Sequence, residues 1–129
     1  MDNDKEAVMK AWRKGSDALE EGDWETYQDY WAHADYIQAI HPKERQWLTG
    51  WEKVGPGYKH LIEEGGEWSA EAVLVSLRVS EGGTMAWLTS KITITVDEEM
   101  EFESWQTSIF EKLGGEWKLV LGHASNLTG

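Results

Sequence analysis

The period of the hydrophobic pattern changes along this chain, and that change constrains the fold more than any single motif. Up to about residue 64, most apolar residues recur every three or four positions, which is typical of amphipathic helices. From residue 71 onward they alternate with polar residues, which is typical of strands with one buried face. Helices followed by a strand meander predict an α+β domain.

The first segment, residues 5–20, has the pattern of an amphipathic helix. Gly22 is expected to end this helix, and Asp23 is expected to cap a second short helix that runs to about Trp31. Charged residues fill one face of the first helix, so the opposite face should be buried. That face carries apolar and small residues, namely Val8, Ala11, Trp12, Gly15, Ala18 and Leu19.

A short strand and a third helix are expected next. Residues 36–41 form a strand-like run that stops at Pro42, because proline has no N–H for a strand ladder. Residues 51–64 are expected to form a helix. Glycines on either side of Pro56 disturb its beginning, so we expect the continuous part to start near Pro56, which suits a first helical turn.

Four strands are expected in the second half, at residues 71–80, 84–96, 100–112 and 116–125. The first should place four apolar residues on one face, namely Val73, Val75, Leu77 and Val79. The short connection at 97–99 sets the register of the central hairpin. It should pair Ile94 with Phe102, Ser90 with Gln106, Leu88 with Ser108, and Ala86 with Phe110.

A Gly-Gly turn at residues 114–115 sets the register of the last strand. It should place Phe110 near Leu119, Ser108 near Leu121, and Gln106 near His123. The inner face would then carry several polar side chains, which a packed core normally avoids unless each finds a partner. A small cavity with convergent polar groups explains them. The outer face, with Trp87, Trp105 and several threonines, is a candidate homodimer interface.

Composition limits the classes of function. The chain has 129 residues, so one domain over residues 1–129 is expected. Its net charge of −12 argues against binding nucleic acids or anionic membranes, whose phosphates would repel it. The absence of cysteine excludes disulfides and fits a reducing compartment. No run resembles a signal peptide or a membrane span, so we expect a cytoplasmic protein.

Three landmarks occur in a characteristic order: Ile40-His41-Pro42, then Leu48-Thr49-Gly50-Trp51-Glu52-Lys53-Val54, and finally the segment from Glu116 to Ser125. With the amphipathic helix before them, they resemble the SnoaL-like branch of the nuclear transport factor 2 superfamily. The resemblance covers nearly the whole chain. It implies a cone-shaped α+β barrel, in which amino-terminal helices pack on a curved, mostly antiparallel sheet. It also implies a pocket at the open end of the cone and, commonly, a dimer.

His41 is the first candidate catalytic residue. The sequence around it resembles ketosteroid isomerase, in which an aspartate just before the proline is the general base, and that position falls on His41 here. Imidazole titrates near neutral pH and can move protons between substrate atoms. The alternative is a structural histidine that donates to a backbone carbonyl. The tyrosine and acid positions of that enzyme fall near Gly15 and Gln106, so steroid isomerisation is not expected.

The other candidate residues are assigned less directly. His123 lies in a segment similar to the closing strand of SnoaL-like proteins, and His41, Gln106 and His123 are expected to surround one ligand. Its alternative role is to hold the end of the strand or to form a dimer contact. Four further residues are expected to contact the ligand: Tyr27, Trp31, Ser90 and Ser108. No cofactor is expected, and no metal site, because the histidines lack tight ligand spacing.

Two functions remain open at this point. One is a small-molecule pocket protein that catalyses cofactor-independent proton transfer on an apolar substrate, as an isomerase, cyclase or dehydratase. His41 would be the base, and Gln106 and His123 would orient the substrate. The other is a non-catalytic ligand-binding or dimeric assembly module that uses the outer face of the sheet.

Overall fold

The computed structural model describes residues 2–41, 46–64, 68–96 and 100–126. Its helices are α1 (Asp2–Glu21), α2 (Trp24–Tyr27) and α3 (Trp51–Glu64), with a short 3₁₀ helix, η1 (Gln28–Tyr30), directly after α2. Its strands are β1 (Gln38–His41), β2 (Gln46–Thr49), β3 (Trp68–Val79), β4 (Met85–Val96), β5 (Met100–Leu113) and β6 (Glu116–Asn126). No helix in these ranges is long and apolar enough to cross a membrane.

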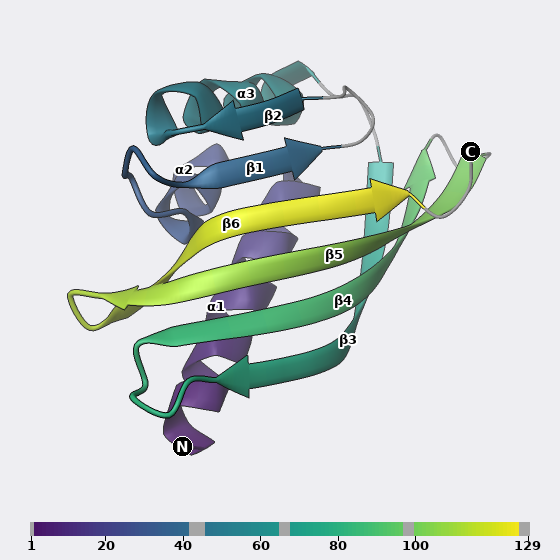
Figure 1. Cartoon of the computed structure of the whole chain (residues 1–129). Coiled ribbons are helices and arrows are strands. Elements are labelled where there is room, and N and C mark those ends of the chain that lie inside the picture. Colours follow the sequence, from purple (N-terminus) through teal and green to yellow (C-terminus); the bar gives the residue numbers. More distant parts are fainter. Residues whose placement is uncertain (1, 42–45, 65–67, 97–99, 127–129) are drawn as a thin grey trace.

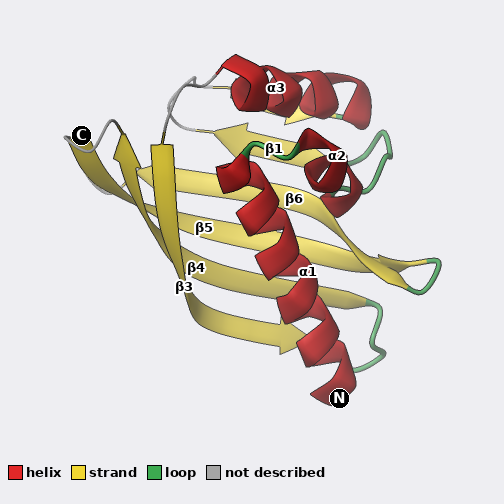
Figure 2. Ribbon diagram, turned by 180° about the vertical axis from the view of Figure 1, so that it is seen from behind, coloured by secondary structure: helices red, strands yellow, loops and turns green. Residues whose placement is uncertain are grey.

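The six described strands form one curved sheet in the order β2-β1-β6-β5-β4-β3 (Figure 1). Neighbouring strands are antiparallel except β1 and β6, which run parallel. The helices lie on one side of this sheet, and α1 crosses its concave face (Figure 2). The predicted α+β cone, with helices packed on a mostly antiparallel sheet, is confirmed.

The turn after α1 forms as its sequence predicts. Gly22 has a φ of 73°, a left-handed conformation that glycine adopts without strain. The Asp23 carboxylate accepts hydrogen bonds from the backbone N–H of Thr26 at 3.2 Å and from its hydroxyl at 2.7 Å. The second helix is shorter than expected, because α2 gives way to η1 and Trp31 is already extended.

The third helix begins earlier than the sequence suggested. It is continuous from Trp51, whereas a start near Pro56 was expected. Gly50 has a φ of 87°, and its carbonyl accepts hydrogen bonds from the N–H groups of Lys53 and Val54, which form the first helical turn. Pro56 therefore lies within the helix and removes one backbone donor without ending it.

The register of the central hairpin is confirmed at all four expected pairs: Ile94 with Phe102, Ser90 with Gln106, Leu88 with Ser108, and Ala86 with Phe110. The expectation for β3 was wrong. Val75 is an extra residue between the Leu74–Ser90 and Ser76–Thr89 pairs, so the strand changes face at this bulge. Val73 and Val75 are exposed, whereas Leu77 pairs with buried Leu88.

A second bulge changes the register of β6. Phe110 pairs with Leu119 as predicted, but Ile109 pairs with Leu121, which leaves Val120 as the extra residue. Beyond this point the prediction was wrong by one position. Ser108 pairs with Gly122 rather than Leu121, Gln106 pairs with Ala124 rather than His123, and His123 pairs with Thr107.

The core lies between α1 and the sheet. The expected stripe of α1 is buried at Val8, Trp12 and Ala18, and these side chains belong to one cluster with Leu88 and Phe110 of the sheet. The outer face of the sheet is different, because large apolar side chains are exposed on it. Among them are Trp47, Trp87 and Trp105, with exposed fractions of 67%, 42% and 59%.

Candidate functional site

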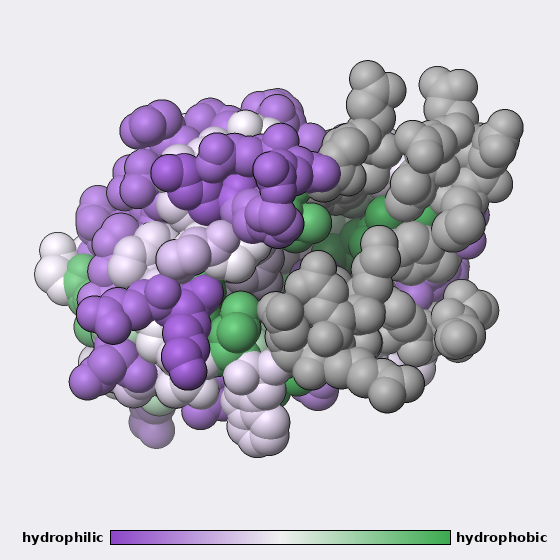
Figure 3. Space-filling view, turned by 90° about the horizontal axis from the view of Figure 1, so that it is seen from above, coloured by the Kyte–Doolittle hydropathy of each residue, from purple (hydrophilic) through white to green (hydrophobic). Residues whose placement is uncertain are grey.

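A cavity of about 520 Å³ lies between the helices and the inner face of the sheet. Residues of the four helical segments border one side of it, and residues of β3 to β6 border the other. Viewed from above, the surface shows apolar side chains inside a hollow, while hydrophilic residues cover much of the surrounding face (Figure 3). This volume is within the range of about 300–1,000 Å³ found for small-molecule sites.

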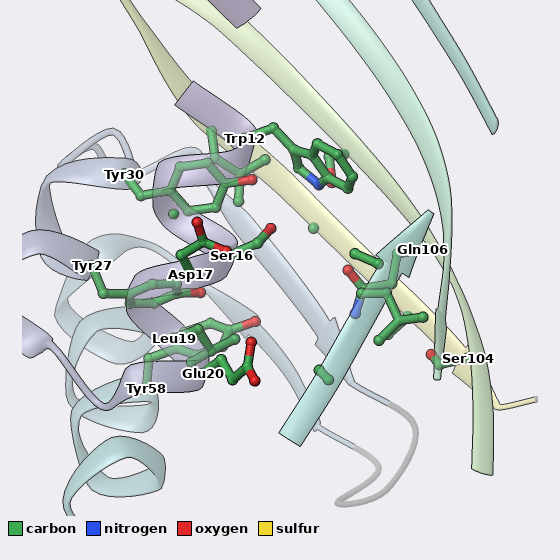
Figure 4. A pocket seen from close by; sticks show the side chains of 18 of the residues that line it. Trp12, Ser16, Asp17, Leu19, Glu20, Tyr27, Tyr30, Tyr58, Ser104 and Gln106 are labelled. Carbon is green, nitrogen blue, oxygen red and sulfur yellow. The ribbon is translucent and has the colours of Figure 1, made fainter. Parts of the chain in front are cut away.

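Aromatic side chains form the helical wall of the cavity (Figure 4). Tyr27 lies at the centre, with its ring centroid 5.8 Å from that of Tyr30 and 5.2 Å from that of Tyr58. The indole N–H of Trp31 donates a hydrogen bond of 3.0 Å to the Tyr27 hydroxyl. Because α2, η1 and α3 each supply a ring, their packing fixes the shape of this wall.

Gly15 makes room for one of these rings. A Cβ atom at this position would lie 2.4 Å from two atoms of the Tyr30 ring, so no larger residue fits without displacing the ring. The ring also contacts Phe110, edge to face, at a centroid distance of 5.8 Å. The position of the ketosteroid isomerase tyrosine falls near Gly15 in the sequence analysis. In this fold, a tyrosine from η1 occupies the space beside it.

The three tyrosines of the wall keep their protons to high pH. Burial raises the pKa of Tyr27 well above its usual value, and the neighbouring Tyr58 adds to the rise. Burial also raises the pKa of Tyr58 to about 12. For Tyr30, burial and Tyr58 raise the pKa strongly, while a hydrogen bond with the Ser108 hydroxyl opposes the rise. Near neutral pH these groups are therefore neutral hydroxyls that can donate hydrogen bonds, not bases.

A polar strip on β5 faces the aromatic wall. Ser104, Gln106 and Ser108 alternate along the strand on its inner face and border the cavity. Ser104 and Ser108 are 2% and 5% exposed, and Gln106 is half-buried. Ser90, opposite Gln106 on β4, is buried but does not border the cavity, and its hydroxyl has no hydrogen-bond partner among the described residues.

The structure does not bring the His123 imidazole beside Gln106. His123 borders the cavity, but the bulge at Val120 pairs it with Thr107, on the alternate positions of β5 from Gln106. Its side chain is exposed, and its Nε2 atom lies 3.4 Å from the Ser125 hydroxyl. His41 is the last residue of β1, where it pairs with Gln46; its side chain lies outside the described residues, and so does Pro42.

Three of the four expected ligand contacts, Tyr27, Trp31 and Ser108, border the cavity, as does the candidate catalytic residue Gln106. The sequence analysis did not select Tyr30 or Tyr58. Both have a local signal: Tyr30 lies three residues after Tyr27, and Tyr58 lies four residues after buried Val54 on α3. Within the described ranges, no group of three or more His, Cys, Asp or Glu residues has the geometry to hold a metal ion.

The solved structures that resemble this chain share its fold. A protein named "putative dehydratase" of the NTF2-like family from Streptomyces avermitilis is 26% identical, with 99% of each chain covered and a TM-score of 0.81. An NTF2-like protein of unknown function from Pseudomonas putida is 17% identical, with 97% of this chain and 87% of that chain covered and a TM-score of 0.82. A "putative calcium/calmodulin-dependent protein kinase type II association domain" from Thiobacillus denitrificans is 21% identical, with 92% and 93% covered and a TM-score of 0.81.

Sequence comparison identifies the family. No curated protein matches this chain. The SnoaL-like domain family, in contrast, matches residues 6–128, which is nearly the whole sequence. The helices packed on a curved, mostly antiparallel sheet agree with this match and with the fold of the NTF2-like structures. The chain therefore belongs to the SnoaL-like domain family, within the NTF2-like superfamily.

Proposed function

We propose that this protein binds a small, largely apolar molecule in the cavity under α1 and holds one polar group of that molecule against β5. The observation that carries this proposal is the pairing of an aromatic wall with a strip of three polar side chains across a cavity of about 520 Å³. The apolar part of the ligand would contact Tyr27, Trp31 and Tyr58. A carbonyl or hydroxyl group would meet the Gln106 amide and the hydroxyls of Tyr30 and Ser108.

We further propose that binding leads to cofactor-independent proton transfer, as in an isomerase, cyclase or dehydratase. Neutral tyrosine and amide groups can stabilise an oxygen atom that gains negative charge when a proton leaves the neighbouring carbon. His41 is the proposed base. The name of the Streptomyces avermitilis protein, "putative dehydratase", supports a reaction of this class. Because His123 pairs with Thr107, we assign the substrate-orienting role that was expected of it to Tyr30 and Ser108.

Ligand binding is tested with matched pairs of small cyclic ketones and hydrocarbons, titrated by ligand-observed NMR. Tyr30→Phe keeps the ring but removes the hydroxyl, so it should weaken ketone binding about fivefold, the effect of one hydrogen bond, and leave hydrocarbon binding unchanged. Tyr36→Phe is the control, because Tyr36 is exposed and its hydroxyl bonds to Glu111 away from the cavity. Failure of every pair to bind would contradict the proposal.

Proton transfer is tested separately, with deuterium exchange into the bound ketones as the readout. His41→Gln should slow exchange by about 10²- to 10⁴-fold if His41 is the general base. His60→Gln is a matched control, because His60 is exposed on α3 and pairs with Glu64. Equal exchange in wild type and His41→Gln, with ligand binding intact, would remove His41 from the mechanism and leave a binding protein.

A second candidate function is assembly through the outer face of the sheet. Trp87 and Trp105 lie on neighbouring strands of this face, and both are exposed. Monomeric proteins rarely leave such aromatic surface uncovered. The Thiobacillus denitrificans protein, named as an association domain, supports this alternative. We propose that a second copy of the chain covers this face. A homodimer of this kind is compatible with a cavity on the opposite face of the sheet.

A further inference from the structure

A chain of hydrogen bonds runs through the aromatic wall of the cavity. The indole N–H of Trp31 donates to the Tyr27 hydroxyl oxygen at 3.0 Å. An indole N–H is a donor only, so the Tyr27 oxygen is the acceptor and its own proton is left for another partner. That partner is the neighbouring Tyr58 hydroxyl, with which Tyr27 forms a side-chain hydrogen bond. The chain therefore has a fixed direction, from Trp31 through Tyr27 to Tyr58.

Tyr58 is the last member of this chain, and it borders the cavity. Its ring packs against Tyr27 at a centroid distance of 5.2 Å and against Trp31 at 5.6 Å. Both of these neighbours are buried, so their packing fixes the position of the Tyr58 ring. Because the Tyr58 oxygen accepts the proton of Tyr27, its own proton is available to a group inside the cavity. Hydrogen bonds in such a chain polarise one another, which strengthens the last donor.

The Tyr58 hydroxyl is separate from the polar groups that are assigned to the ligand at β5. Tyr27 lies between Tyr58 and Tyr30, and its ring contacts both of them (Figure 4). Tyr30 bonds to Ser108 of β5, whereas Tyr58 belongs to α3 and bonds to Tyr27. The cavity therefore has two hydrogen-bonding sites, one at β5 and one on α3, with the Tyr27 ring between them.

We propose that the Tyr58 hydroxyl binds a second oxygen atom of the ligand, so that the molecule in this cavity carries two separate hydrogen-bond acceptors, as a dione or a keto ester does. This inference rests on the proposed function, because it names the chemical class of the molecule that the same cavity binds. One oxygen lies against β5, and the other accepts a hydrogen bond from Tyr58. The apolar body between them contacts the rings of Tyr27 and Trp31. A largely apolar cavity selects its ligand through its few polar groups, because a buried donor left without a partner costs free energy.

The test uses two matched pairs of probes, titrated by ligand-observed NMR: trans-1-decalone with trans-decalin-1,5-dione, and trans-2-decalone with trans-decalin-2,6-dione. The two diones place their second oxygen at different positions relative to the first. Tyr58→Phe keeps the ring but removes the hydroxyl. It should weaken the binding of at least one dione about fivefold, the effect of one hydrogen bond, and leave its monoketone unchanged. Any advantage that a symmetric dione gains from its two equivalent orientations is the same in wild type and variant, so it does not affect this comparison.

Two other variants each remove one tyrosine hydroxyl and serve as controls. Tyr30→Phe removes the hydroxyl assigned to the first oxygen, so it should weaken a monoketone and its dione by the same factor. Tyr36→Phe should change neither, because Tyr36 is exposed and its hydroxyl bonds to Glu111 away from the cavity. Only Tyr58→Phe should separate a dione from its monoketone.

Each contrary result has a distinct meaning. If Tyr58→Phe weakens neither dione while the monoketones bind, the inference is overturned and the proposed function stands. An equal loss for a dione and its monoketone in Tyr58→Phe would also overturn the inference, because Tyr58 would then affect the shape of the cavity or the same oxygen as Tyr30. If none of the four probes binds to the wild-type protein, the proposed function fails together with the inference.

Discussion

The fit between Gly15 and the Tyr30 ring can be tested with one added methyl group. In Gly15→Ala, the new Cβ would lie 2.4 Å from ring carbons, far inside van der Waals contact. Phe110 and Tyr27 restrict the movement of the ring, because both pack against it at centroid distances of 5.8 Å each. We therefore expect the substitution to destabilise the fold, although alanine normally favours a helix over glycine.

The expected size follows from two opposing effects. Overpacking costs about 1–3 kcal/mol, and we take the upper end because the added Cβ lies so close to the ring and two further aromatic rings pack against it. The intrinsic gain of alanine over glycine inside a helix is about 1 kcal/mol. The net loss in the free energy of unfolding should thus be about 2 kcal/mol. In a Tyr30→Leu background the clash is gone, so the same Gly15→Ala change should become stabilising by up to about 1 kcal/mol.

The assay is urea unfolding followed by circular dichroism and by tryptophan fluorescence, with all four proteins of the double-mutant cycle. Gly57→Ala is the control: it lies inside α3, and its added Cβ would meet only the Leu48 Cδ1 methyl group, at 3.1 Å. It should be neutral or stabilising. Two results would refute this reasoning: Gly15→Ala as stable as Gly57→Ala, or an effect of Gly15→Ala on the free energy of unfolding that is the same with and without Tyr30. Either would mean that the Tyr30 ring does not fill the space beside Gly15.

Two further predictions concern alkaline pH and assembly. All four tyrosines have a raised pKa, Tyr27, Tyr30 and Tyr58 mainly through burial and Tyr36 through its hydrogen bond with Glu111. The stability given by the neutral hydroxyls is complete below the ordinary tyrosine pKa of about 10 and is lost as pH rises through the folded values. The ultraviolet absorbance of tyrosinate from Tyr27, Tyr30 and Tyr58 should therefore appear only as the protein unfolds. In Tyr36→Phe, which lacks the exposed tyrosine, a rise in this absorbance at a lower pH than unfolding would contradict the burial of the other three hydroxyls. For assembly, Trp105→Lys should turn a homodimer into a monomer in sedimentation experiments, because it places a charge in the proposed interface; an unchanged mass would place the interface elsewhere.

Much of the fold could be predicted because its signals are local. The stripe of α1 and the turn at Gly22 depend on residues close in sequence, and both are confirmed. The register of β4 and β5 follows from a short connection and from the mismatch that a one-residue slip would create. Strand β2, in contrast, has only four residues, too few for a periodic pattern, and it pairs with β1 alone.

The candidate site could be predicted only in part, for a physical reason. The polar strip of β5 was found because alternation along one strand is readable from sequence. The fit of Tyr30 over Gly15 joins two elements whose packing no local pattern specifies. The bulges at Val75 and Val120 are also hard to predict, because neither extra residue is a glycine or lies in a turn. A bulge bends its strand, and the curvature of the sheet depends on all of its strands together.

The bulge at Val120 shows how one extra residue decides what the cavity contains. Without it, the alternation of β6 would turn Leu121 and His123 toward Ser108 and Gln106 and fill part of the space. With it, Gly122 and Ala124 occupy those positions, and a Cβ at Gly122 would already lie 3.3 Å from the Trp31 ring. The strand therefore contributes room rather than chemistry. The polar groups opposite the tyrosines come from β5, which is why the proposed ligand contacts lie on that strand and on the helices above it.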